Sequence, residues 1–365
     1  MTPAAYLQTV QAEYVREATD ESPYETYFLE VSAILQPFAG AGLIDKLRGA
    51  APGLVKDLGR GDTGLGDATL REIVRKVIER ESGRDTQTPE QIFQGLVDRL
   101  SPSLSKQGLK PSDLRELIAI GTLQHDEPNA RARLVPGGLG FVVLVHTGMW
   151  AFLSACSKVI ALSTQPQGTS EPMLDSVVRD KLLRALVRLT AFAPGFLSRL
   201  ETQHLSGYYQ DAFAHHLAIS TKQFVVAHEL AHLICGHLSE QRDKLIRLAS
   251  DSVTPLPTDW EQEHEADTIG MSLLINTNKQ QDRREILWTY LGCDAFLGIS
   301  HILERAFALS ANSHPPAIVR RSRLREHLKA NFPAAAEALL QPAETMGSLM
   351  DAMAESAACQ PATAQ

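Results

Sequence analysis

Two histidines four residues apart, His228 and His232, enclose a glutamate, Glu229, in an apolar stretch of the chain. On an α-helix, residues i and i+4 project from one face, so both imidazoles can reach a single Zn²⁺ ion at about 2.0–2.1 Å. The carboxylate of Glu229 is then held beside the same ion. This H-E-x-x-H arrangement is the signature of a zinc hydrolase.

The motif requires a helix, and residues 224–237 favour one. Their apolar side chains form an almost continuous cylinder, which predicts a helix buried on most sides, and Gly236 marks its expected end. The alternative is a buried helix whose histidines only form hydrogen bonds within a core. Two histidines and a glutamate at ligand spacing are costly to bury without a partner, and a metal ion is the natural one.

A catalytic zinc usually has three protein ligands and an open position for water. A metzincin would supply the third ligand from a histidine six residues after His232, preceded by a glycine, but this chain has Leu238 and Cys235 at those positions. The metzincin arrangement is therefore excluded. His237 has the wrong register to join the other two histidines from the same face, and we interpret it as a residue that ends the helix or supports a ligand.

The acidic segment 261–267 is the better source of a third ligand. If it is helical, Glu263 and Asp267 share a face, so one carboxylate can bind the metal while the other orients a histidine through its free N–H group. Glu265 points elsewhere on such a helix. The alternative is a solvated acidic first turn of an ordinary helix.

Three blocks of sequence carry a family resemblance. The segment His228–His232, then Glu263-x-x-x-Asp267, then the segment from His314 to Arg320 occur in the order found in the gluzincin peptidases that include the CAAX prenyl proteases and the membrane heat-shock protease HtpX. The chain resembles these families over about residues 129–330 and is expected to be a variant without their transmembrane helices. A more distant comparison is the Lit phage-exclusion peptidase, which also has the H-E-x-x-H motif.

The resemblance implies specific roles. It makes Glu263, rather than Glu265, the third metal ligand, gives Asp267 the role of orienting a ligand, and places His314 and Arg320 in the active site as catalytic or supporting residues. One Zn²⁺ per chain is the implied cofactor, with Glu229 as the general base. The candidate donors to the oxyanion are, in falling order, His314, Arg320, Tyr208 and Tyr209.

Residues 129–147 read as a strand, with a helix following from about Met149. In the resembled families an edge strand of this kind lies beside the metal helix and can pair with an extended substrate, whereas the plain alternative is a core strand. No charged residue occurs between Arg133 and Lys158. Proline and glycine interrupt that run, so a strand and a buried helix explain it better than a membrane span.

Composition restricts the class of protein. The chain has 365 residues, 44% of them hydrophobic and 21% charged, which is enough for a large core. A net charge of −8 argues against nucleic acid as a partner. The four cysteines are scattered without a C-x-x-C pair, which favours reduced thiols. Because the amino terminus lacks the pattern of a signal peptide, we expect a cytoplasmic protein.

The expected fold is mainly α, of the α+β class, with a zincin-like core and a small β-sheet beside the H-E-x-x-H helix. We divide the chain into a helical amino-terminal region (1–125), a zincin-like peptidase domain (126–342) and a partly disordered tail (343–365). Periodicity predicts helices at 5–18, 23–38, 68–82, 89–100, 111–122, 172–193, 206–217, 221–237, 261–275, 281–310 and 316–330.

The leading hypothesis is a zinc-dependent endopeptidase that acts on an intracellular protein or peptide. The alternative is a regulatory or phage-defence module that uses a zincin body as a sensor or as a protein-binding platform. The sequence specifies neither the substrate nor the oligomeric state.

Overall fold

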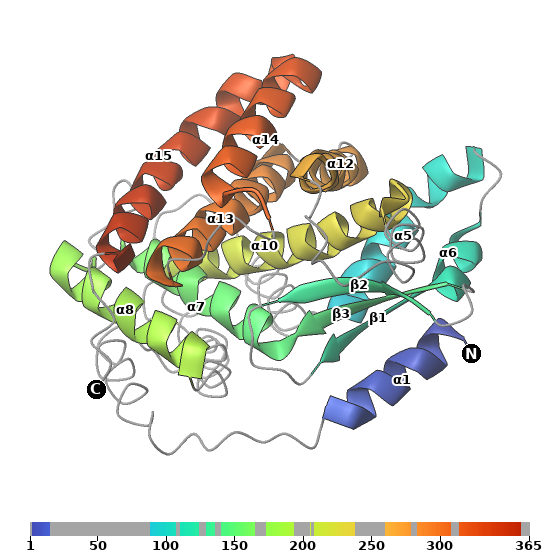
Figure 1. The fold of residues 1–365 in the computed structure, drawn as a ribbon. Helices are drawn as coiled ribbons and strands as arrows, with labels where there is room; N and C mark the ends of the chain where they lie inside the picture. Colours follow the sequence, from blue (N-terminus) through green and yellow to red (C-terminus); the bar gives the residue numbers. More distant parts are fainter. Residues whose placement is uncertain are drawn as a thin grey trace, which may run out of the picture.

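The computed structural model shows a mostly helical protein with a small sheet, which confirms the mainly α, α+β class (Figure 1). The helices predicted at 23–38 and 68–82 lie outside the residues that it describes. The described residues are 2–14, 88–106, 110–123, 129–135, 140–164, 173–192, 205, 208–237, 260–278, 283–307 and 314–358.

The sheet has three strands in the order β1-β3-β2, with β1 at Ile118–Leu123, β2 at Ala130–Leu134 and β3 at Phe141–His146. β1 runs parallel to β3, and β2 runs antiparallel to it. β3 is therefore the central strand, β1 and β2 are the edge strands, and β2 packs against the helix that carries the H-E-x-x-H motif. Of the two alternatives left open for residues 129–147, the core strand therefore describes β3, while the alternating Ala-Arg-Ala-Arg segment of β2 forms the edge.

The predicted helix at 111–122 is only half correct. Helix α6 ends at Leu117 (Pro111–Leu117), and the following residues form β1. Ile118 and Ile120 are buried while Ala119 between them is less so, which is the alternation of a strand. So short an apolar run fits the periodicity of a helix as well as that of a strand. Pairing with β3 makes it a strand.

Helices cover both faces of the sheet. α1 (Pro3–Tyr14) packs on one face, where Val10 meets Val142 and Leu144 of β3 (Figure 1). Val143 and Val145 point to the other face and join the main core together with α5 (Pro89–Lys106). The sheet thus contains β1 from the expected amino-terminal region and runs across the expected boundary at 125.

The uncharged run after Arg133 forms β3 and the buried helix α7 (Thr147–Leu162), as predicted. α8 (Ser176–Phe192) follows. Within the described part of the chain, one helix is long and apolar enough to cross a membrane, α13 (Arg283–Phe307), and 61% of its apolar window is buried inside the fold. Burial of this kind is typical of a core helix.

The H-E-x-x-H motif lies on α10 (Tyr208–Ile234), which runs through the middle of the molecule between α7, α12 and α13 (Figure 1). Two separate helices were predicted here, at 206–217 and 221–237. The structure has one, because the residues between them, Ala218 to Ser220, include no glycine or proline to break it. A single long helix gives the motif a rigid support.

Two glycines allow the helices around α10 to approach closely. α12 (Trp260–Asn278) crosses α10 at Gly270, where a Cβ atom would lie 3.1 Å from the backbone nitrogen of His228. On α13, a Cβ at Gly292 would lie 2.4 Å from the backbone carbon of Ser220. The contact at Gly270 brings the acidic face of α12 against the histidines of α10.

The carboxyl-terminal part is more ordered than the expected tail. After α14 (Ala317–Asn331), helix α15 spans Pro333–Ala358 and packs on α13. Met346, Met350 and Met353 are buried on its inner face, at helical spacing. Residues 343–358 of the expected, partly disordered tail are therefore helical, while residues 359–365 lie outside the described part of the chain.

Candidate metal centre

The two motif histidines face each other on α10 as their spacing predicts. Nε2 of His228 lies 3.1 Å from Nε2 of His232. Glu263 of α12 reaches the same point: its carboxylate oxygens lie 3.6 Å from Nε2 of His228 and 3.5 Å from Nε2 of His232. Three ligand atoms from two helices therefore converge, and they come from the residues predicted to bind the metal.

The spacing of these atoms fits a zinc ion. For bonds of about 2.0–2.1 Å, the ligand atoms of a tetrahedral site are separated by about 3.3 Å. The two Nε2 atoms lie 3.1 Å apart, and the Glu263 carboxylate approaches them with Oε1 at 3.5 Å from His232 and Oε2 at 3.6 Å from His228. One oxygen of Glu263, Oε2, is buried without a hydrogen-bond partner, with the charge of Arg320 3.4 Å away, so this oxygen remains able to bind a metal ion. The donor set therefore fits a bound metal.

Glu263 is held as a carboxylate. Burial by itself raises its pKa, but a hydrogen bond from His314 and the charges of His228 and Arg320 outweigh burial and lower the pKa well below its usual range. Nη1 of Arg320 lies 3.4 Å from Oε2. An ionised oxygen is the form that binds a metal ion.

Asp267 lies behind His228, one turn after Glu263 on α12. Its Oδ1 is 3.0 Å from Nδ1 of His228. Both of its oxygens also accept hydrogen bonds from the Arg320 side chain, at 2.7 Å each. Burial raises the pKa of Asp267, but Arg320 and His228 together lower this pKa by more than burial raises it, so the carboxyl is ionised. A carboxylate on Nδ1 leaves Nε2 of His228 for the metal.

His232 is neutral in this environment. Burial, followed by the charge of His228, lowers its pKa to about 3. Its Nδ1 lies 2.9 Å from Nδ1 of His237, and Nε2 of His237 lies 3.0 Å from Oε2 of Glu265. His237 thus supports a ligand, as one of the two predicted roles has it, and Glu265 contacts His237 instead of the three-ligand cluster.

Glu229 lies at the interface between α10 and the edge strand. Its carboxylate is buried and accepts a hydrogen bond from the backbone N–H group of Ala132 in β2. Burial is the main cause that raises the pKa of this carboxyl, and the nearby charge of Glu263 raises it further. The role of Ala132 was missed in the sequence, although the alternation of residues 130–134 is a strand signal.

The two downstream candidates occupy different positions. His314 is 55% exposed, and its Nδ1 lies 3.2 Å from Oε1 of Glu263, so its ring borders both the metal ligands and the solvent. Arg320 is buried, and two of its N–H groups, on Nε and Nη2, donate hydrogen bonds to Asp267. Arg320 therefore positions the two carboxylates of α12 and is poorly placed as a donor to an oxyanion.

Tyr208 and Tyr209 do not belong to the site. They begin α10, and His228 follows twenty residues after Tyr208 on the same helix. With a rise of 1.5 Å per residue, this separation is about 30 Å. Their interpretation as oxyanion donors is wrong, because closeness in sequence becomes distance along a continuous helix.

Residues 197–340 match the sequence model of the family Peptidase U49. The match to this Lit-like metallopeptidase family supports a peptidase, and hence a hydrolase. The matched range contains every side chain of the site described above but not Ala132 of β2. Its match favours the Lit comparison over the resemblance to the prenyl proteases and HtpX. No curated protein and no solved structure matches the chain.

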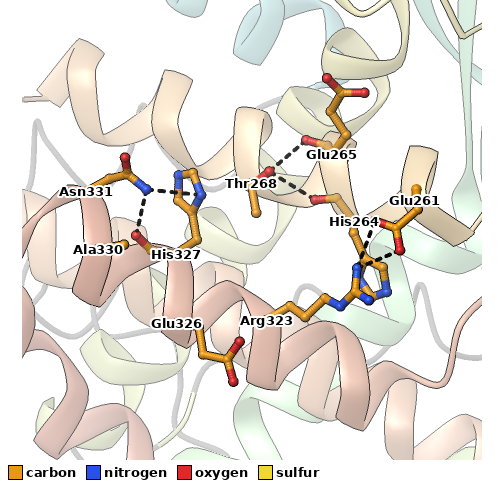
Figure 2. A pocket seen from close by; sticks show the side chains of 9 residues that line it. All are labelled: Glu261, His264, Glu265, Thr268, Arg323, Glu326, His327, Ala330 and Asn331. Atoms are coloured by element: carbon orange, nitrogen blue, oxygen red, sulfur yellow. Dashed lines mark hydrogen bonds and ion pairs between the residues drawn. The ribbon is translucent and has the colours of Figure 1, made fainter.

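A groove lies on another face of α12, away from Glu263 and Asp267. Figure 2 shows the side chains that border it, with α12 on one side and α14 on the other. Arg323 crosses the groove and forms an ion pair with Glu261 at 2.9 Å. The lining residues of the groove are Glu261, His264, Glu265, Thr268, Arg323, Glu326, His327, Ala330 and Asn331.

Proposed function

We propose that this protein is a zinc-dependent endopeptidase that hydrolyses peptide bonds of an intracellular protein or peptide. The observation that carries the proposal is the convergence of His228, His232 and Glu263, with separations that fit one tetrahedral zinc ion per chain. The match to Peptidase U49 supports the reaction class independently.

The ligand set suits catalysis rather than a structural role. Two histidines and a glutamate leave one of four tetrahedral positions for water or substrate, whereas structural zinc sites are usually closed by four protein ligands. Zinc bound there would supply a Lewis acid that polarises the scissile carbonyl and makes water nucleophilic near neutral pH. The residues around it determine where protons and substrate go.

Glu229 acts as the general base in this mechanism. It follows His228 directly in the helix, and its carboxylate is held between α10 and β2 by the N–H group of Ala132. A carboxylate oxygen of Glu229 accepts a proton from the attacking water and passes it to the leaving amine nitrogen. The hydrogen bond from Ala132 fixes the carboxylate on the side of the cluster that faces β2.

His314 stabilises the negative charge that develops on the carbonyl oxygen. Its Nδ1 contacts Glu263, while more than half of its side chain is exposed. Because the ring borders both a metal ligand and solvent, its other nitrogen, Nε2, can reach a substrate that enters from outside, and it donates to the oxyanion when both ring nitrogens carry a proton. Arg320 acts indirectly, since it holds Asp267 and lies close to Glu263.

The edge strand β2 is the proposed docking site for the substrate backbone. In β2, Ala132 directs its N–H group to Glu229, away from β3, so alternate residues present their backbone groups at the free edge. An extended peptide can pair with this edge and bring a scissile bond to the metal site. The same arrangement favours an internal peptide bond over a chain end, as in an endopeptidase.

The order of the three sequence blocks is part of the proposal as well. Glu263 and Asp267 one turn apart on α12, followed by His314 and Arg320, have the spacing of the prenyl proteases and of HtpX. In this chain each of the four contacts another member of the cluster. We propose a shared ligand arrangement with those families, without extending their substrates to this protein.

A search for new protein termini in cells tests the function and identifies the substrate. Cells that express the wild type are compared with cells that express Glu229→Gln, which keeps the ligands and removes the base. We expect new amino termini with the wild type alone. A biological effect that is equal for both variants, without new termini, would instead favour a sensor or binding platform.

A further inference from the structure

A second group of polar side chains lies at the carboxyl-terminal end of α10, next to the proposed metal ligands. It consists of Cys235, His237 and Glu265, and its inner member, His237, contacts His232. The side chain of His237 is only 3% exposed, whereas that of Glu265 is 57% exposed. The group therefore connects a ligand of the metal site to the surface.

The backbone at Gly236 makes this contact possible. Its φ of 76° lies in the left-handed region, which ends the helix and turns the chain back on itself. Without that turn, His237 would continue the helix five residues after His232 and point away from it. The turn explains how a residue out of register with His232 on the helix still contacts it.

The positions of the protons follow from the metal site. If Nε2 of His232 binds the metal, the ring proton of this neutral imidazole lies on Nδ1. Nδ1 of His237 is 2.9 Å away and must then accept that hydrogen bond. His237 consequently carries its own proton on Nε2, which is 3.0 Å from Oε2 of Glu265 and donates to it.

We propose that His237 and Glu265 form a hydrogen-bonded relay that fixes the ring and the tautomer of His232. This inference rests on the proposed metal site and deepens it. His228 has a carboxylate directly on its Nδ1, Asp267 at 3.0 Å. His232 obtains the same support through one intervening histidine, so both ligands are oriented by carboxylates of α12.

Cys235, His237 and Glu265 could instead hold a second metal ion, since one ligand atom from each lies within 4.8 Å of the others. The relay excludes this when the first site is loaded. A metal on Nε2 of His237 would require the proton on Nδ1, where it would face the proton on Nδ1 of His232. The thiol of Cys235 instead donates to Glu265. The structure therefore assigns one metal ion to the two clusters together.

Zinc affinity, measured by competition with a chromophoric chelator, tests the relay without any assay of cleavage. We expect His237→Ala to bind zinc about 10–100-fold more weakly than the wild type, the usual effect of removing a group that orients a ligand. His237→Asn should recover most of the affinity, because its side-chain oxygen can accept from Nδ1 of His232. Cys235→Ala should bind like the wild type.

Glu265→Ala tests the outer half of the relay. Because its side chain is largely exposed, this change leaves the fold intact even if His237→Ala does not fold. We expect weaker zinc binding and an altered absorption spectrum of the Co²⁺-substituted protein, since ligand orientation sets that spectrum. If Glu265→Ala acted only by removing a surface charge, the Co²⁺ spectrum would stay as in the wild type.

Three results would overturn the relay. One is wild-type zinc affinity in both His237→Ala and Glu265→Ala. Another is His237→Asn binding no better than His237→Ala. The third is two zinc ions per wild-type chain, with one lost in Cys235→Ala. A wild-type protein that binds no zinc at all would instead refute the proposed function on which the relay depends.

Discussion

Oδ1 of Asp267 lies 3.0 Å from Nδ1 of His228, on the side of the ring away from the ligand nitrogen. Asp267 is completely buried, and its charge is offset by Arg320 through two hydrogen bonds. A buried ion pair with such geometry is costly to assemble and more costly to break. It holds α10, α12 and α14 in one arrangement around the proposed metal.

Removal of this carboxylate should weaken both the metal site and the fold. In Asp267→Ala, His228 loses its orienting partner, so zinc affinity should fall about 10–100-fold. Arg320 is left buried with one weaker contact, so the free energy of unfolding should fall by about 3–5 kcal/mol. Chelator competition and urea denaturation measure the two effects. The matched control is Asp98→Ala, which removes an exposed ion pair with Arg115 and should cost less than about 1 kcal/mol.

Arg320 should not be replaceable by lysine. A lysine cannot donate two parallel hydrogen bonds to Asp267, so Arg320→Lys should lower the free energy of unfolding by about 1.5–3 kcal/mol. Arg323→Lys is the control on the same helix, because Arg323 contacts the exposed Glu261. Equal effects of the two substitutions in denaturant titrations would contradict the role given to Arg320.

His314 should affect turnover far more than metal content. It is half-exposed and borders the site without being one of the three ligands. His314→Ala should lower kcat by about 10²–10³-fold, as expected for a donor to the oxyanion, with a smaller change in KM. Steady-state kinetics on a cleaved peptide, with zinc content measured in parallel, test this. An unchanged kcat would exclude His314 from the reaction.

The inner face of α15 should contribute strongly to stability. Met350 is completely buried and packs at Gly298 of α13. Met350→Ala should cost about 2–5 kcal/mol of unfolding free energy through the cavity that it leaves. Ser348→Ala, on the exposed face of the same helix, should change it by less than about 0.5 kcal/mol. A tail without packing would give small effects at both positions.

The cluster of the candidate metal ligands could be predicted because its geometry is local and periodic. Four-residue spacing on a helix brings His228 and His232 to one point, and Glu263 and Asp267 share a face for the same reason. Which of the acidic residues binds the metal depended on a family resemblance. The crossing of α12 and α10 at Gly270 completes the site, and no short pattern reports a contact between helices.

Other features depended on contacts that the sequence does not show. Residues 118–123 became a strand because β3 offered them a partner. His237 joined the site through the left-handed turn at Gly236, and Glu265 became its partner only after that turn placed it there. The helix at 343–358 forms because its methionines find an apolar surface on α13.

The zinc content of the purified protein tests the central claim most directly. Elemental analysis should find one zinc per chain in the wild type and in Glu229→Gln, since Glu229 is not one of the three clustered ligands. His232→Ala, which removes one of the three converging atoms, should lose most of the zinc under the same conditions. Stoichiometric zinc in His232→Ala would contradict the account, because the metal would then lie elsewhere.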